Sequence, residues 1–229
     1  MEEKKTHLPD NFSIKINDEP LERVEQSKFL GVIIDAGCTW QPHVQYLSKK
    51  IAKSIGILSL ARQTLNKKTL TQLYYSFIYP YLLYCNIIWG KAAENHIWPI
   101  FKLQKIAIRI INNIPRRDST IKFFFTNKIL RVPEIHKYTI GIFMFNHNRG
   151  KHPQIFDNFF QKNENIHHYA TRSASNLRPP RIKTLLAEKF IKRTGVEFWN
   201  KLQQIIPTNI SESTFKKYLK TYLLKPYNE

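Results

Sequence analysis

The side chains that could carry out catalysis are few and stand far apart in this sequence. An enzyme that works through a divalent metal ion places two or more carboxylates together. Asp35 follows an apolar stretch with no second acid at useful spacing, and Asp118, Asp157 and Glu188 are equally isolated. With seven glycines in all, the chain also lacks a Gly-rich phosphate-binding loop. The sequence therefore predicts no catalytic residue.

Cysteines and histidines offer no metal site either. Cys38 and Cys85 form no CxxC pair, and no Cys/His cluster has the spacing of four zinc ligands. The neighbouring His167 and His168 lie in a polar stretch, where histidines are usually just exposed. Two free thiols are typical of a reducing compartment. Because the first twelve residues are polar and charged, we expect no signal peptide. The localisation is unknown from the sequence, beyond an intracellular compartment that is either nuclear or cytoplasmic.

The positive signal is charge. The formal net charge is +19, and residues 1–40 hold five Lys/Arg against eight Asp/Glu, whereas residues 41–229 hold 31 against nine. Such a field suits a polyanion, of which nucleic acid is the commonest. An anionic membrane is the second interpretation, and a merely soluble basic protein is the third.

Basic residues interleaved with aromatic ones are typical of nucleic-acid binding, because cations neutralise phosphates and rings stack on bases. Five tyrosines between residues 74 and 84 fit a core better than a stacking surface. One basic set lies in the first half of the chain and a second near its end. We expect contacts to nucleic acid from Lys49, Lys50, Lys53, Arg62, Lys67 and Lys68 in the first set, and from Arg172, Arg181 and Lys183 in the second.

These side chains must be positioned by a fold that changes character near residue 40. Residues 12–16 alternate apolar and polar, residues 21–24 resemble a short strand, and Phe29 to Ile34 form a dense β-branched run. We expect an antiparallel unit of two or three strands. Gly31 interrupts the run and indicates a bulge or a close backbone approach.

Helical patterns dominate after residue 40. An apolar stripe from Val44 to Leu58, with Pro42 in the first turn, predicts one helix, and residues 97–114 predict another with Gln104 on its inner face. Residues 69–90 carry no charge. They are long enough to span a membrane, but their tyrosines and Pro80 favour a central helix pair that is buried all round and kinked or broken near Pro80.

The last third of the chain predicts an interruption and then more helices. Residues 133–147 have a helical pattern, whereas 149–180 are rich in Asn, Pro and His and predict a linker or irregular segment. Helix is expected again over 181–206, with Phe190 among its core residues, and over 215–224, capped by Ser211 and with Tyr218 on its inner face.

Several motifs in one order resemble a known family. KFLGVIID (28–35), followed by TW and His43, is similar to the end of the palm in reverse transcriptases of non-LTR (LINE-type, jockey-like) retrotransposons. Motifs similar to the thumb and C-terminal region of these enzymes follow: KKIAKSIGIL (49–58), LYYSFIYPYLLYCNIIWG (73–90), LQKIAIRII (103–111), HHYATR (167–172), GVEFWNKLQQIIP (195–207) and FKKYLKTYLL (215–224).

The resemblance implies a mainly α fold in four parts: a palm-end β remnant (1–40), a helical thumb-like domain (41–148), a linker (149–180) and a C-terminal helical region (181–229). It places Phe29, Leu30 and Gly31 at the primer grip, the hairpin that positions the 3′ end of the primer. Lys4 or Lys5 matches, over two residues only, the lysine segment that follows the catalytic aspartates.

A sequence close to YADD holds the polymerase metals in this family, and this chain contains none. The resemblance therefore implies an N-terminally truncated reverse transcriptase whose parent uses Mg²⁺, whereas this chain alone has no cofactor and is inactive. We expect it to bind RNA or an RNA–DNA hybrid, and its other partner would be the missing palm and fingers. The alternatives are a domesticated protein-interaction module and, third, a membrane-associated basic protein.

Overall fold

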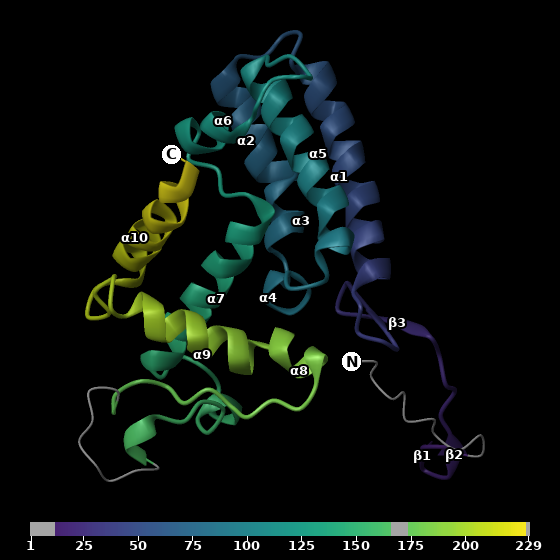
Figure 1. Ribbon diagram of the computed structural model, residues 1–229. Coiled ribbons are helices and arrows are strands. Elements are labelled where there is room, and N and C mark those ends of the chain that lie inside the picture. The colour runs from purple at the N-terminus through teal and green to yellow at the C-terminus, as the bar shows by residue number, and fades with distance from the viewer. Residues whose placement is uncertain (1–11, 166–173, 228–229) are drawn as a thin grey trace.

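The described chain begins with two β-hairpins and continues as helices (Figure 1). The computed structural model describes residues 12–165 and 174–227. Strand β1 (Lys15–Ile16) pairs antiparallel with β2 (Glu19–Pro20), and β3 (Gln26–Phe29) pairs antiparallel with β4 (Val32–Asp35). After β4 the described residues form helices and loops, apart from one isolated bridge. The prediction of a mainly α fold with a short N-terminal antiparallel unit is confirmed.

The apolar run at residues 29–34 forms a turn between two strands, so the prediction of one strand was wrong. Leu30 and Gly31 have φ of 45° and 83°, and they join Phe29 to its partner Val32. Two central residues with positive φ make the tight hairpin turn whose twist matches that of the strands. Gly31 is therefore required by the turn and not by a mid-strand bulge.

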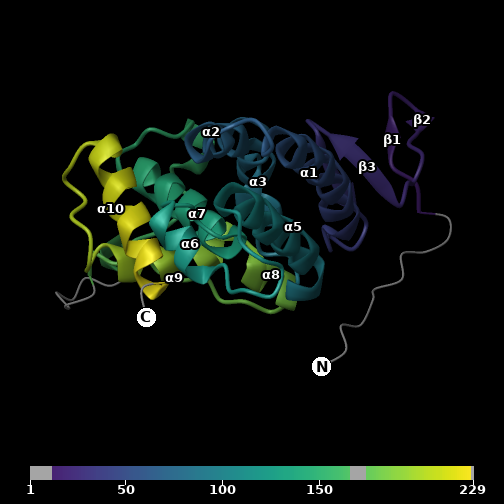
Figure 2. The ribbon, with the colours of Figure 1, turned by 90° about the horizontal axis from the view of Figure 1, so that it is seen from above.

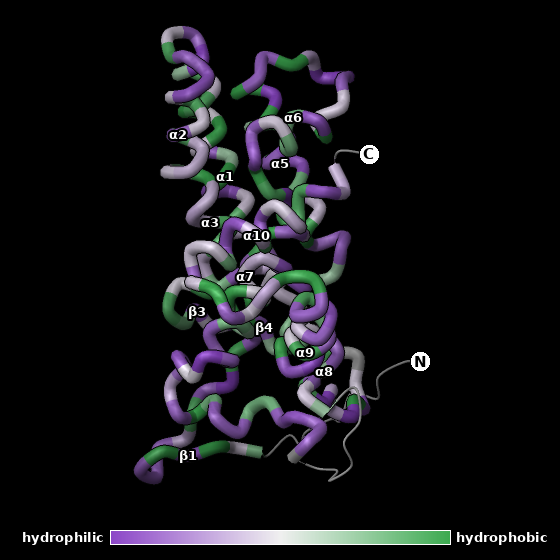
Figure 3. The backbone as a smooth tube through the Cα atoms, turned by 90° about the vertical axis from the view of Figure 1, so that its left-hand side faces the viewer, coloured by the Kyte–Doolittle hydropathy of each residue, from purple (hydrophilic) through white to green (hydrophobic). Residues whose placement is uncertain are grey.

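The first hairpin is shorter than the sequence predicts, and residues 21–24 form no strand. Figure 2 shows β1 and β2 lying away from the helices, and Figure 3 shows hydrophobic segments beside β1 at this end of the molecule. Because nothing in the described chain covers these segments, apolar side chains stay exposed, among them Phe12, Ile14, Ile16, Leu21 and Val24.

Asp35 connects the second hairpin to the first helix, α1 (Gln41–Ala61). Its carboxylate accepts hydrogen bonds from the Thr39 N–H (2.9 Å), the Thr39 hydroxyl (2.8 Å) and the Trp40 N–H (2.9 Å). Burial raises the pKa of Asp35, but these hydrogen bonds outweigh it and the pKa is lowered overall. Nearby, the Ile33 N–H donates to Nδ1 of the buried His43 (3.3 Å). The carboxylate of Asp35, which is isolated in the sequence, thus has a structural role as a hydrogen-bond acceptor.

Replacing Asp35 with Ala is expected to lower the free energy of unfolding by about 1.5 kcal/mol at pH 7, since three donors lose a charged acceptor. The folded-state pKa lies below the unfolded value, so this stabilisation is present above that value and is lost as pH falls through the folded pKa. Urea unfolding at pH 7 and pH 3 should therefore show a smaller difference between the two proteins at pH 3. Glu22→Ala, at an exposed position, is the control; a difference that does not change with pH would contradict this role.

Helix α5 (Glu94–Asn112) forms a bundle with α1 and with the uncharged stretch of residues 69–90. The predicted stripe of α1 is confirmed, because Val44, Leu47, Ile51, Ile55 and Leu58 are all buried. The uncharged stretch returns antiparallel to α1 and α5 in Figure 1. After the two lysines that begin α2 (Lys67–Phe77), it forms the rest of that helix, α3 (Tyr79–Leu83) and α4 (Asn86–Trp89).

The break predicted near Pro80 falls at Ile78. Pro80 occupies the first turn of α3, where the backbone N–H that proline lacks would have no partner within the helix. The prediction that this stretch is buried all round was wrong, because Phe77, Tyr84 and Ile88 are exposed. Within the described residues, none of the helices combines the length and the apolar character needed to cross a membrane.

Gln104 is the polar centre of the bundle and is 1% exposed. Its Nε2 donates to the Tyr74 hydroxyl (2.9 Å) and to the Leu130 carbonyl (2.8 Å), while its Oε1 accepts from the Val132 N–H (3.0 Å). Every polar atom of the side chain is thereby used. These bonds join α2 to α5, and α5 to the start of α7 (Val132–Asn148).

The C-terminal helices pack on α7. Helices α9 (Ile191–Leu202) and α10 (Glu212–Leu224) both contact it, and the rings of Phe145 and Phe215 stack 4.1 Å apart. The Ser211 hydroxyl accepts from the Thr214 N–H, which confirms the predicted cap. Phe190 and Tyr218 are exposed, so their placement in the core was wrong.

The remaining elements are α6 (Ile121–Thr126), α8 (Leu185–Lys189) and the 3₁₀ turns η1 (Gln154–Phe156), η2 (Asn163–Asn165) and η3 (Lys225–Tyr227).

The described parts of 149–180 are irregular but anchored. Lys162 and Leu177 form an antiparallel bridge, and Phe160 and Leu177 are buried. The division into four parts at residues 40, 148 and 180 stays a prediction.

Candidate nucleic-acid interface

One face of α5 carries an aromatic residue followed by three cations. Trp98, Lys102, Lys105 and Arg109 are spaced by four, three and four residues, which places them on one side of the helix. The Trp98 side chain is 47% exposed. The Lys105 ammonium lies 4.5 Å from the centroid of the Trp98 ring and that of Lys102 lies 5.8 Å from it. The packing of Ile97, Ile100 and Gln104 into the core turns this face outward.

Two further arginines extend this face into a cationic hollow of about 540 Å³. Arg62 follows the C-terminal end of α1, and Arg116 follows that of α5. Helix C-terminal ends favour cations, because the last carbonyls point outward there. The cationic hollow is lined by Arg62, Lys102, Lys105, Arg109 and Arg116, together with the apolar Ile106, Ile110 and Ile114.

No acidic side chain neutralises these five cations within residues 12–165 and 174–227, where none of them forms an ion pair. Residues 41–148 contain sixteen Lys/Arg and three Asp/Glu, and Glu134 is already paired with Arg131. Arg109 donates to the Asp118 backbone carbonyl (3.2 Å), whereas its buried Nε has no partner.

Lys105 is affected both by burial and by the neighbouring cations. Its pKa is lowered, first by burial and then by repulsion from Arg109 and Lys102. Anions placed between these groups would relieve the repulsion, so the geometry of the cationic hollow suits the phosphates of a nucleic-acid backbone.

The structure does not gather the first predicted basic set in one place. Of that set, Arg62 lines the cationic hollow. Lys49, Lys50 and Lys53 are exposed on α1, away from its buried stripe, and the Lys50 ammonium lies 5.6 Å from the Tyr46 ring centroid. The exposed Lys67 and Lys68 begin α2. Lys102, Lys105, Arg109 and Arg116 were absent from the predicted contacts, although the spacing of three and four along 98–109 signals a shared face.

The predicted primer-grip residues lie at the tip of the second hairpin. Phe29 and Leu30 are 64% and 73% exposed. The Leu30 carbonyl accepts a hydrogen bond from the Tyr84 hydroxyl (2.6 Å), which fixes the tip to the segment between α3 and α4. A Cβ on Gly31 would lie 3.6 Å from the Tyr84 ring, an ordinary contact, so the turn and not crowding requires glycine. Their role at a primer stays a prediction.

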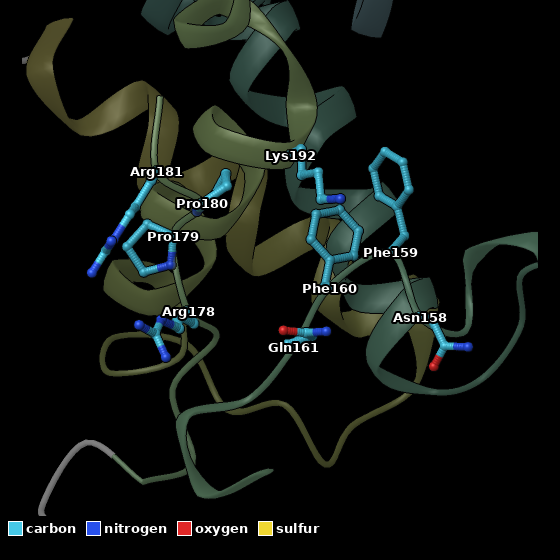
Figure 4. A pocket seen from close by; sticks show the side chains of 9 residues that line it. All are labelled: Asn158, Phe159, Phe160, Gln161, Arg178, Pro179, Pro180, Arg181 and Lys192. Atoms are coloured by element: carbon cyan, nitrogen blue, oxygen red, sulfur yellow. The ribbon is translucent and has the colours of Figure 1, made fainter. Parts of the chain in front are cut away.

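The second basic set contributes to a smaller pocket of about 460 Å³, which we call the C-terminal pocket. Arg181 lines it, the exposed Lys183 lies just beyond, and Arg172 falls outside the described residues. Figure 4 shows the nine lining side chains: Asn158, Phe159, Phe160, Gln161, Arg178, Pro179, Pro180, Arg181 and Lys192.

No three His, Cys, Asp or Glu side chains lie together as a metal site requires, within the residues that the structure describes. Both carboxylate oxygens of Asp35, the best candidate for a metal ligand, already accept hydrogen bonds from Thr39 and Trp40. These residues therefore do not fit the magnesium ions of a polymerase.

The class of protein that this chain resembles is the RNA-directed DNA polymerase of mobile elements, and the resemblance to the non-LTR reverse transcriptases is confirmed. The probable polymerase of transposon BS from Drosophila melanogaster is 30% identical over 117 residues, which are 48% of this chain and 13% of the relative. The polymerase of mobile element jockey from Drosophila funebris is 30% identical over 106 residues, 44% of this chain and 12% of the relative.

The probable polymerase of transposon X-element from Drosophila melanogaster is also 30% identical, over 102 residues that are 43% of this chain and 11% of the relative. The matched region thus spans 11–13% of the length of these curated relatives. No protein-family model matches the chain, and no solved structure matches it.

Proposed function

We propose that this chain binds RNA or an RNA–DNA hybrid through the cationic hollow and does not polymerise DNA by itself. The observation that carries this proposal is the set of five cations that line the hollow, one at the end of α1 and the others along and just after α5, which have no ion-pair partner in the described chain. The relatives are named as RNA-directed DNA polymerases, and this supports nucleic acid as the ligand class. The resemblance assigns Mg²⁺ to the parent polymerase, and no described residue of this chain is proposed to bind it.

Salt dependence tests the proposal directly. Each neutralised phosphate contributes about −0.9 to the slope of log K against log salt concentration, so five contacts predict a slope of roughly −4.5. Raising salt fourfold, from 50 to 200 mM, should therefore weaken binding of a labelled 12-base-pair RNA–DNA hybrid several hundred-fold in fluorescence anisotropy. Absence of binding at 50 mM, or affinity independent of salt, would refute the proposal.

Trp98 provides a control for the location of the ligand. It is exposed, whereas Trp40, Trp89 and Trp199 are buried, so a ligand at this face quenches the fluorescence of Trp98 above all. Quenching by the hybrid should vanish in Trp98→Phe while the salt slope remains.

A second function, interaction with another protein, is favoured by the hairpins. Phe29 and Leu30 are exposed at the tip of the second hairpin, and further apolar side chains are exposed among residues 12–24. Surfaces of this kind are typical of protein interfaces. The partner that we propose is the palm and fingers portion of a polymerase, and co-purification with such a portion tests it.

A further inference from the structure

The C-terminal pocket is built from residues 158–161, residues 178–181 and Lys192 of α9, which the fold holds in place. The Arg178 N–H donates to the Gln161 carbonyl (2.7 Å). The Asn200 side chain of α9 accepts from the Leu177 N–H (3.0 Å) and donates to the Leu177 carbonyl (2.7 Å). Because Phe160 and Leu177 are also buried, the walls are preformed although their secondary structure is irregular.

The charges in this pocket are of one sign. Arg178, Arg181 and Lys192 line it, and none of its nine lining residues is acidic. Arg193 of the same helix as Lys192 is paired with Glu197, whereas none of the three lining cations forms an ion pair within the described chain. The planar guanidinium groups can grip phosphate oxygens with two parallel hydrogen bonds.

The opposite side of the pocket has different chemistry. Figure 4 shows Arg178 and Arg181 on one side, Phe159 and Asn158 on the other, and Gln161, Phe160 and Lys192 between them. The Lys192 ammonium lies 5.0 Å from the Phe159 ring centroid. A partly exposed ring can stack on a base, and side-chain amides can bond to the edge of a base. The pocket thus has a phosphate side and a base side.

We propose that the C-terminal pocket binds one unpaired nucleotide of a single-stranded nucleic acid, with its phosphate on Arg178 and Arg181 and its base on Phe159. A duplex keeps its bases stacked inside the helix, so the base of a paired nucleotide does not reach a ring within a pocket. The inference rests on the proposed function in that the ligand is nucleic acid, but it uses residues outside the cationic hollow.

The experiment compares two labelled probes, a 12-nucleotide oligouridylate and the 12-base-pair hybrid, at about 0.1 M salt. In the double variant Arg178→Glu with Arg181→Glu, oligouridylate affinity should fall at least tenfold while hybrid affinity changes less than about threefold. The matched control is Lys189→Glu with Lys217→Glu, which makes the same change in charge at exposed positions outside the pocket and should alter oligouridylate affinity less than about twofold.

Phe159→Leu tests the base side without changing charge. Loss of one stacked base should weaken oligouridylate binding about tenfold, and circular dichroism should show an unchanged helical fold. Free uridine monophosphate should compete more strongly than inorganic phosphate; equal competition together with an inert Phe159→Leu would overturn the base assignment.

The outcomes separate this inference from the proposed function. Oligouridylate binding that is unchanged in both pocket variants, or equally reduced in the control, overturns the inference, whereas hybrid binding by the wild-type chain still supports the cationic hollow. Retained, pocket-dependent oligouridylate binding without hybrid binding supports the inference and refutes hybrid binding by the cationic hollow.

Discussion

Reversing two charges in the cationic hollow, Arg62→Glu with Lys105→Glu, is expected to weaken hybrid binding roughly 50-fold or more at about 0.1 M salt. Removal of two phosphate contacts lowers the magnitude of the salt slope by about 1.8, and the new carboxylates add repulsion. Neither cation has an ion-pair partner within the described chain, so the fold should persist. Anisotropy titrations across a salt series measure both the affinity and the slope.

The matched control is Lys49→Glu with Lys53→Glu, which changes the net charge equally on the exposed face of α1. Because these lysines do not line the cationic hollow, their reversal should weaken binding by only a few-fold through the long-range field. An equal loss in both double variants would show that overall charge, and not the cationic hollow, attracts the ligand.

Replacing Gln104 with Leu is expected to destabilise the protein by about 4 kcal/mol. The substitution keeps the approximate volume but leaves the Val132 N–H, the Leu130 carbonyl and the Tyr74 hydroxyl without their partner in the core. Each buried polar group left unsatisfied costs about 1–3 kcal/mol. Urea denaturation followed by circular dichroism measures the free energy of unfolding.

Tyr74→Phe is the graded control, because it removes one of the three hydrogen bonds and should cost about 1 kcal/mol. A loss below about 1 kcal/mol for Gln104→Leu would show that these bonds do not hold α2, α5 and α7 together. These core hydrogen bonds also bear on the proposed function, because the opposite face of α5 carries cations of the hollow.

Local signals were enough to predict much of the fold. The stripe from Val44 to Leu58 specified α1 and its buried face, because residues three and four apart share one side of a helix. Ser211 predicted the start of α10, because a hydroxyl at the N-cap position accepts a hydrogen bond from a backbone N–H that has no partner within the helix. Pro80 marked the break in the uncharged stretch to within two residues.

The hairpin around Gly31 was harder to predict. Leu30 adopts a positive φ that a bulky side chain disfavours, so a β-branched run was a stronger signal for one strand than for a turn. Its tip is also fixed by the Tyr84 hydroxyl, a residue 54 positions away that no local pattern connects to it.

The sequence by itself determined that the chain is basic after residue 40, mainly helical and similar to reverse transcriptases, because composition, periodicity and motif order are local properties. Only the tertiary structure decided which cations lie together in space. It set Arg62 beside Lys105 and Arg109 through the packing of α1 on α5, and it left Lys49 and Lys53 on a separate face. Electrostatic attraction falls off with distance in space, and distances between helices depend on core packing that no spacing along one helix encodes.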